Sequence, residues 1–292
     1  MAMKKLLLLI MSCVLMIACS KTSDEIDQNG GKYVDIEFNA YSVEHTLMDS
    51  LSTRVAIGDV FSSLDFVIYS VTDDAYSVFS IVRQSKSNAD FGHIKLSKVP
   101  YGVYKVVAVG HNCSSPAVFN SPEYVDFGGK VNETFVAYKD ITIDGGTDVS
   151  QSLMLKRITS MFMLRISDVQ PSNIASVDFL LTGASTNFNP STGLSYSTSA
   201  TVRTIHVDVS SFAGKTNVEL FFHMFLPTDA ATVTIVANFM DADGNTLLTK
   251  QFSPVEMGVN EKTIYSGNIY SQERSYMVDV DDTWRGTKEI SF

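Results

Sequence analysis

The sequence is poor in cysteine, with three among its 292 residues. Cys13 and Cys19 lie in the N-terminal stretch, so Cys113 is the one cysteine in the rest of the chain. A single thiol cannot form an intrachain disulfide framework, which excludes the small disulfide-stapled secreted domains. We expect Cys113 to behave as a small buried hydrophobic residue. The alternative is a reactive thiol beside His111.

Positive charge is also scarce. The chain has 22 lysine and arginine residues against 32 aspartate and glutamate residues, which gives a formal net charge of −10 at pH 7. Nucleic-acid binding needs clustered positive charge to displace counterions from the phosphates, so the composition argues against a nucleic-acid partner. An acidic surface suits solubility outside the cell.

Motifs for catalysis and for cofactors are missing. The sequence has no G-x-S-x-G, H-E-x-x-H, C-x-x-C, phosphate-loop or dinucleotide-binding motif. Asp241, Asp243 and Asn245 resemble the first three ligand positions of a calcium loop, but position twelve is Phe252, so we expect a plain turn. His223 lies in a strongly apolar stretch, where we expect a core histidine. We predict a protein that is not an enzyme and that holds no metal or cofactor; the remaining catalytic alternative is a hydrolase with two carboxylates brought together by the fold.

The N-terminal apolar run is too short to span a membrane. Residues 6–17 form a run of about 12 residues, whereas a transmembrane helix needs roughly 20. Lys4 and Lys5 precede this run and the small Ala18 follows it. This order is typical of a secretory signal peptide, so we expect residues 1–18 to be removed on export.

The residue after this stretch changes the interpretation. Residues 15–19 (LMIAC) resemble a bacterial lipobox, with Met16 where leucine is usual. The resemblance implies a diacylglycerol and an acyl chain on Cys19; the alternative is an ordinary signal peptide followed by an incidental cysteine. Residues 19–31 are polar and end in Gly-Gly, which predicts a lipidated flexible tether. We therefore expect an outer-membrane lipoprotein at the cell surface.

The rest of the chain shows the period of β-strands and no convincing helical period. Residues 33–40 alternate between apolar and polar side chains, which is typical of a half-buried strand. Residues 103–110 are apolar on both faces, which predicts a central strand. Turns are predicted at residues 144–146 and 241–245, both as β-hairpins, and longer loops at residues 112–134 and 183–200. Short strands separated by turns every 8–12 residues predict two all-β domains in tandem, residues 32–157 and 158–292.

Four stretches together resemble one family. They are residues 99–110 (VPYGVYKVVAVG), residues 152–157 with the strand that follows, residues 258–267 and residues 282–286 (DTWRG). The resemblance is to the fimbrillin-A-associated anchor and fimbrillin-like lipoproteins of type V pili, and it covers most of residues 32–292.

The resemblance implies two transthyretin-like (Greek-key) β-sandwiches and assembly of a fimbria by strand exchange. In that family a protease cuts a subunit after an arginine, the first strand leaves, and a C-terminal strand of the neighbouring subunit takes its place. Here residues 32–40 would be the first strand and Arg54 the cleavage site. The physical basis is β-augmentation, in which an open sheet edge offers unpaired N–H and C=O groups. The candidate donor-strand residues are Tyr276, Val278, Val280, Ile290 and Phe292.

Three roles stay open at this point. The first expectation is the lipid-anchored base subunit, which keeps its lipid and is not cut. The second is a stalk or tip subunit that is cleaved after Arg54. The third is a surface lipoprotein that binds glycan through exposed aromatic residues, with Tyr196 and Trp284 as candidates. The expected partners are other fimbrial subunits and the outer-membrane lipid.

Overall fold

The computed structural model describes residues 32–44, 53–55, 57–196, 202–271 and 286–292. In these residues nearly all of the regular secondary structure is β-strand, and the all-β prediction is confirmed. The one α-helix of the described part, α1 (Ile57–Val60), is a single turn. None of the described helices has the length and apolar character needed to cross a bilayer.

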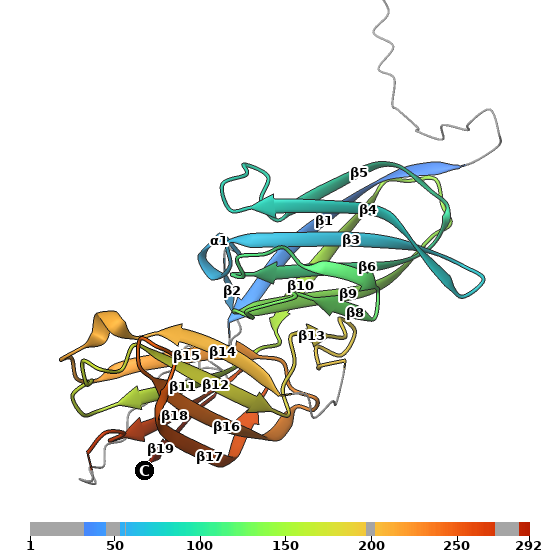
Figure 1. The fold of residues 1–292 in the computed structure, drawn as a ribbon. Helices are drawn as coiled ribbons and strands as arrows, with labels where there is room; N and C mark the ends of the chain where they lie inside the picture. The colour runs from blue at the N-terminus through green and yellow to red at the C-terminus, as the bar shows by residue number, and fades with distance from the viewer. Residues whose placement is uncertain (1–31, 45–52, 56, 197–201, 272–285) are drawn as a thin grey trace, which may run out of the picture.

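The N-terminal half is a β-sandwich made from one folded sheet (Figure 1). One layer contains β5, β1 and β10, and the other contains β9, β6, β3 and β4. The strands are β1 (Tyr33–Glu44), β2 (Thr53–Val55), β3 (Ser63–Thr72), β4 (Ala75–Ser85), β5 (His93–Pro100), β6 (Gly102–His111), β7 (Val118–Ser121), β8 (Tyr124–Asp126), β9 (Thr134–Ile143) and β10 (Val149–Arg157). Their apolar faces form one core between the layers.

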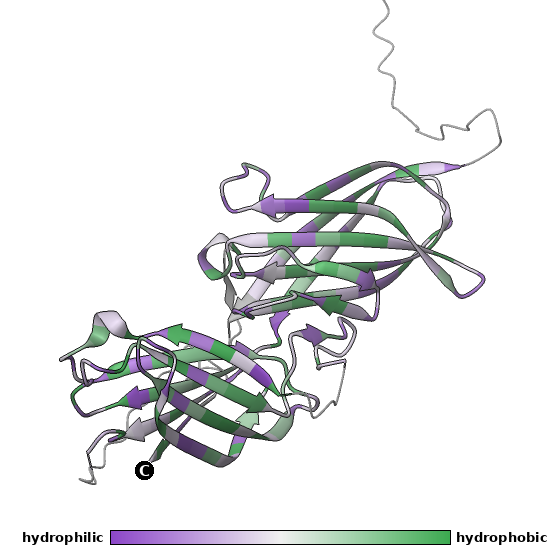
Figure 2. Ribbon diagram, in the orientation of Figure 1, coloured by the Kyte–Doolittle hydropathy of each residue, from purple (hydrophilic) through white to green (hydrophobic). Residues whose placement is uncertain are grey.

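Strand β6 is buried on both faces, as its composition predicts. Val106 and Ala108 point into the core of the sandwich, whereas Val107 and Val109 belong to a second apolar cluster on the other face. Figure 2 shows hydrophobic residues, in green, along the strands of this half and hydrophilic residues, in purple, at several of its turns. A strand covered on both faces has no polar side to place in water.

The C-terminal half contains two four-stranded sheets that face each other across an aromatic core. Phe162, Phe179 and Phe222 lie with ring centroids 5.1–6.5 Å apart at its centre. The strand orders are β15-β11-β18-β19 and β14-β12-β16-β17. The strands are β11 (Ser160–Ile166), β12 (Ser176–Thr182), β13 (Asn187–Phe188), β14 (Arg203–Asp208), β15 (Val218–Met224), β16 (Ala230–Met240), β17 (Thr246–Gly258), β18 (Glu261–Gly267) and β19 (Gly286–Ser291).

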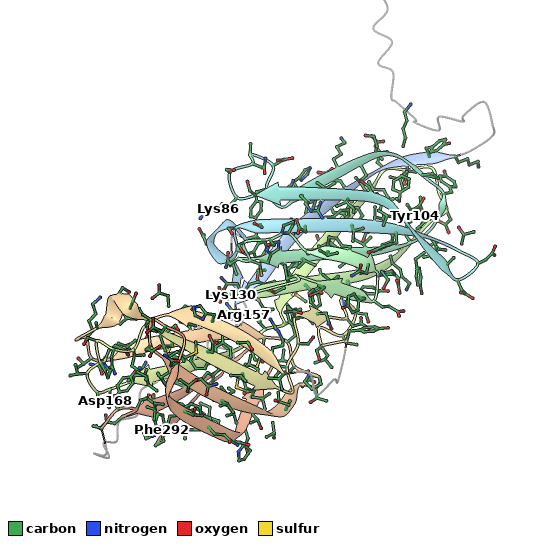
Figure 3. All side chains as sticks on the ribbon, in the orientation of Figure 1. Lys86, Tyr104, Lys130, Arg157, Asp168 and Phe292 are labelled. Atoms are coloured by element: carbon green, nitrogen blue, oxygen red, sulfur yellow. The ribbon has the colours of Figure 1, made fainter. Side chains whose placement is uncertain are left out.

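The two halves share a packed junction. Strand β13 leaves the C-terminal half and pairs with β8 of the N-terminal half, and Phe188 on β13 is fully buried there against Phe225 and Phe127. Arg157, at the junction in Figure 3, pairs with Glu133 at 3.3 Å and lies 4.9 Å from the Phe135 ring centroid. The residues between 183 and 196, expected to be a loop, therefore provide part of the contact between the halves.

One predicted hairpin is wrong. The turn at residues 144–146 does not join two paired neighbours, because β9 and β10 pair only at Phe135–Arg157 and Val136–Lys156, far from the turn. Next to the turn, β9 pairs with β6 and β10 pairs with β1. The turn signal is local, whereas the partner of β10 lies more than a hundred residues earlier in the chain.

The hairpin at residues 241–245 is confirmed. Asp241 N donates to Asn245 O, and Gly244 has φ of 83°. The Asp241 carboxylate accepts hydrogen bonds from Asp243 N and Asn245 N, so it stabilises the turn itself. This is the plain turn that we expected in place of a calcium loop. The described residues contain no group of three or more acidic, His or Cys side chains that could hold a metal ion.

The core of the N-terminal half gives a first prediction. Phe38 on β1 has no exposed surface and packs on Phe66 at 5.0 Å between centroids. Phe38→Ala should lower the free energy of unfolding by about 3–5 kcal/mol because it leaves a cavity. The control is Val118→Ala, since Val118 is 49% exposed and its truncation should cost under about 0.5 kcal/mol. Chemical denaturation measures both; equal losses would contradict the prediction.

His223 on β15 gives a second prediction. As expected it is buried, and burial, together with the charges of Arg157 and Lys130, lowers its pKa to about 4. The folded state therefore favours the neutral imidazole, and the stability from this preference is present above pH 6.5 and lost as the pH falls toward 4. Between pH 6.5 and pH 4, the free energy of unfolding should fall by roughly 1–3 kcal/mol less in His223→Gln than in the parent chain. Unfolding curves at several pH values test this, and parallel curves for both chains would refute it.

Candidate functional site: the first strand and the C-terminal strand

Strand β1 lies inside its layer rather than at the edge. Its residues Ile36–Ser42 pair in parallel with Val149–Leu155 of β10. On the other side its first part pairs with antiparallel β5, and its last three residues pair with β2. The strand next to the predicted tether is thus enclosed by backbone partners on both sides.

The inward side chains of β1 fill the sandwich core. Val34 is 3% exposed, and Ile36 and Phe38 are fully buried. Each such side chain contributes about 1.5–3 kcal/mol by leaving water. If β1 were absent, the groove between β5 and β10 would therefore be lined with apolar surface and unpaired backbone groups.

The outward side chains of β1 make polar contacts to its neighbours. Asp35 accepts hydrogen bonds from Lys98 N at 3.1 Å and from Ser97 Oγ at 3.4 Å, both on β5. His93 of β5 contacts Asn39 Oδ1 at 2.9 Å and Glu37 at 2.7 Å. These contacts fix the register of β1 against β5.

Arg54, the candidate cleavage residue, lies in the three-residue strand β2, where its backbone pairs with Val43 of β1. A cut after Arg54 would divide β2 and leave β1 joined to the body of the protein only by non-covalent contacts. Cys19, at the candidate lipidation site, lies outside the described residues, as do residues 1–31 as a whole.

The end of the chain forms strand β19, which pairs in parallel with β18 as the outermost strand of its sheet in the described part. Ile290 packs against the C-terminal core, and the Phe292 ring lies 5.4 Å from Phe252. Figure 1 places β19 in the C-terminal half, away from β1. Two candidate donor residues therefore lie on their own domain; Tyr276, Val278 and Val280 fall outside the described residues.

Strand β19 is also fixed by charge. The Glu289 carboxylate, 4% exposed, accepts hydrogen bonds from Ser266 Oγ at 2.7 Å and from Arg165 Nη1 at 3.3 Å. Arg165 also pairs with Glu219 at 2.9 Å, so one guanidinium links three strands of the sheet.

Asp168 holds the segment that follows β18. Its carboxylate accepts hydrogen bonds from the backbone N–H groups of Ile269, Tyr270 and Ser271 at 2.6–3.1 Å (Figure 3). Burial, and then the Asp168 charge, raise the pKa of Tyr270, whose hydroxyl donates to Gln170 Oε1 at 2.6 Å. The sequence contains no motif that would predict this contact, and Asp168 was not among the predicted site residues.

A cavity of about 350 Å³ lies beside Cys113. The thiol sulfur accepts a hydrogen bond from Asn132 N, and Cys113 N donates to His111 Nδ1 at 3.2 Å. His111 Nε2 lies 3.2 Å from Asp65, which also pairs with Arg83 at 3.6 Å. Cys113 is 8% exposed and belongs to the second apolar cluster, together with Val107 and Val109, as expected of a buried hydrophobic cysteine.

Of the two aromatic residues considered for glycan binding, the structure describes one. Tyr196 is 54% exposed and packs edge-on against Tyr124 with centroids 5.0 Å apart. Trp284 lies outside the described residues.

No protein-family model matches the chain, and no curated protein matches its sequence. Among solved structures it resembles a candidate adhesin from Bacteroides ovatus, with TM-score 0.49, 14% identity and coverage of 75% of this chain and 82% of that one. It also resembles a candidate polysaccharide-binding protein from Bacteroides thetaiotaomicron (TM-score 0.47, 9% identity, coverage 74% and 79%) and the fimbrial anchor protein of Porphyromonas gingivalis (0.38, 13%, 75% and 82%).

Asp168 gives the prediction from this site. Asp168→Asn removes the charge that three backbone donors share, and the free energy of unfolding should fall by about 1.5–3 kcal/mol. Hydrogen exchange at Ile269, Tyr270 and Ser271 should become faster. Asp178→Asn is the matched control, because Asp178 forms a surface pair with His206 that should contribute under about 1 kcal/mol. Unchanged exchange at the three amides would rule out the role given to Asp168.

Proposed function

We propose that the chain is a lipid-anchored, non-enzymatic subunit of a surface fimbria, with the base subunit as its first role. The supporting sequence features are the lipobox-like residues 15–19 and the resemblance to fimbrillin-like lipoproteins. The supporting structural observation is the parallel pairing of β1 with β10.

This pairing suits a protein that carries load. A pull from the membrane enters at the Tyr33 end of β1, and a pull from the C-terminal half enters at the Arg157 end of β10. Because β1 and β10 are parallel, these two forces act along the strands in opposite directions. Seven residue pairs then resist together in shear instead of opening one after another. A base subunit between a lipid and a fibre needs this resistance.

The stalk or tip role follows if Arg54 is cut. Strand β1 and the lipid on Cys19 would then leave, and the groove between β5 and β10 would accept a strand from a neighbouring subunit. The donor residues would be Tyr276, Val278, Val280, Ile290 and Phe292, and the last two would have to leave β18 first. The uncut chain keeps β1 in this groove, which favours the base role.

A glycan-binding lipoprotein is the second candidate. It is favoured by the edge-on pair of the exposed Tyr196 and the half-buried Tyr124, since aromatic faces stack on sugar rings.

Two measurements test the base role. Labelled palmitate should enter the protein, and Cys19→Ser should abolish the label. Incubation of the purified chain with an arginine-specific protease should leave residues 19–54 attached. Absence of label in the parent chain would overturn the lipid anchor, and discrete loss of residues 19–54 would assign the protein to the stalk or tip.

Assembly has a separate test. Non-boiled electrophoresis of cell envelopes should place the protein in a ladder of high-mass bands, because exchanged strands resist mild detergent. A single monomer band, together with retention on immobilised glycan, would favour the glycan-binding role instead.

A further inference from the structure

Strand β4 is an open edge with apolar side chains. It forms one end of the eight-stranded sheet and, among the described residues, pairs with β3 alone. Tyr76, Val78, Phe79 and Ile81 are between 38% and 50% exposed. The strand has eleven residues, no proline and one charged side chain, that of Arg83.

Other edges of the molecule carry the features that discourage pairing with another chain, namely charged side chains and proline. Strand β5 is the edge of the other layer of the N-terminal sandwich. Its Lys95 and Lys98 are exposed, Lys98 has φ of 57°, and Pro100 ends the strand. The charged or proline residues of further edge strands are Lys250, Pro254 and Glu256 on β17, Arg203 and Asp208 on β14, Glu219 on β15, and Lys288 and Glu289 on β19. For its length, β4 has the fewest charged or proline residues of these strands, which marks it as an interaction surface.

We propose that β4 pairs with β4 of a second copy of this chain, antiparallel about a two-fold axis. Such a contact joins two four-stranded layers into one continuous sheet and is self-complementary, as a two-fold interface must be. This role is independent of strand exchange at β1.

The turn that begins β4 determines which backbone groups face outward. Asp73 and Asp74 have φ of 49° and 61°, as in a two-residue hairpin turn, and Ala75 is the first residue paired with β3. Backbone groups of successive residues alternate in direction. Tyr76 and Val78 therefore direct theirs away from β3.

A bulge in the β3–β4 ladder then shifts this alternation by one residue. Beyond it, Ile81 and Arg83 direct their backbone groups outward. The register that matches outward groups with outward groups around the centre of β4 places Val78 opposite Ile81 and Tyr76 opposite Arg83 of the other copy. The two central pairs are thus aliphatic with aliphatic and aromatic with cation.

The same register makes the strand ends complementary in charge. It brings the exposed turn residues Asp73 and Asp74 at the start of β4 in one copy next to the exposed Lys86, which follows the end of β4 in the other, once at each end of the pair. Figure 3 shows Lys86 at the loop end of β4, where Lys86 N donates to Ser62 O at 2.9 Å and fixes the position of the backbone. This match, made twice by symmetry, is what selects a second copy as the occupant. Phe79, within the bulge, packs on Tyr104 at 5.9 Å and stays with its own sandwich.

The first experiment measures self-association of the full chain in density-matched detergent with a reductant, by sedimentation over a range of protein concentration. We expect a reversible monomer–dimer equilibrium. Val78→Lys combined with Ile81→Lys should raise the dissociation constant at least tenfold. The matched control is Val169→Lys with Leu247→Lys, which adds the same charge at residues that are 56% and 46% exposed and should leave the equilibrium unchanged. Thermal unfolding checks that both variants fold.

The second experiment tests the register. Lys86→Glu should weaken the dimer severalfold, because the new carboxylate would lie beside the acidic turn of the other copy, and addition of Asp73→Lys should restore it. The proposal is overturned if the parent chain stays monomeric at all concentrations, if the β4 lysines leave the dimer intact, or if the control pair disrupts it equally. Loss of rescue with an otherwise β4-dependent dimer would overturn the register.

Discussion

The fold depends on the insertion of β1 between β10 and β5. A chain that enters its domain through a central strand makes the entry point part of the core, since Ile36 and Phe38 are fully buried and their backbone is paired on both sides. The rest of the N-terminal sandwich follows from this, because β10 can reach β1 only by leaving β9 at the 144–146 turn. The corner between β9 and β10 is therefore open, and the sheet folds there into two layers.

The sequence predicted the strands better than their partners. Alternation over residues 33–40 and the apolar run over residues 103–110 identified β1 and β6 because burial acts on each residue locally. The predicted hairpin at residues 144–146 failed for the opposite reason: the pairing of β10 with β1 is decided by contacts across more than a hundred residues. Likewise, the two-residue strand β13 has no period of its own, and it forms because Phe188 fits the junction.

The candidate site shows the same difference between local residue patterns, which the sequence reveals, and long-range contacts, which it does not. The lipobox-like stretch, Arg54 and the apolar C-terminus were visible as residue patterns. The contacts that hold the C-terminal segment were not, because Asp168 and Glu289 act through backbone amides and an arginine that lie up to 124 residues away. Ordinary acidic residues acquire these roles only when β11, β18 and β19 come together in one sheet.

The edges of the sheets unite these observations. A β-sandwich leaves unpaired backbone hydrogen-bonding groups at every edge. Each edge is covered by the chain itself, protected by charged residues or proline, or paired with another chain. Strand β19 covers the edge of β18, and lysines and a proline protect β5. Strand β4 has neither kind of cover, and its bulge, which on many edges prevents pairing, here only moves the outward backbone groups by one residue. In the proposed pairing, the partner that matches this edge needs both an aliphatic centre and opposite charges at the two ends.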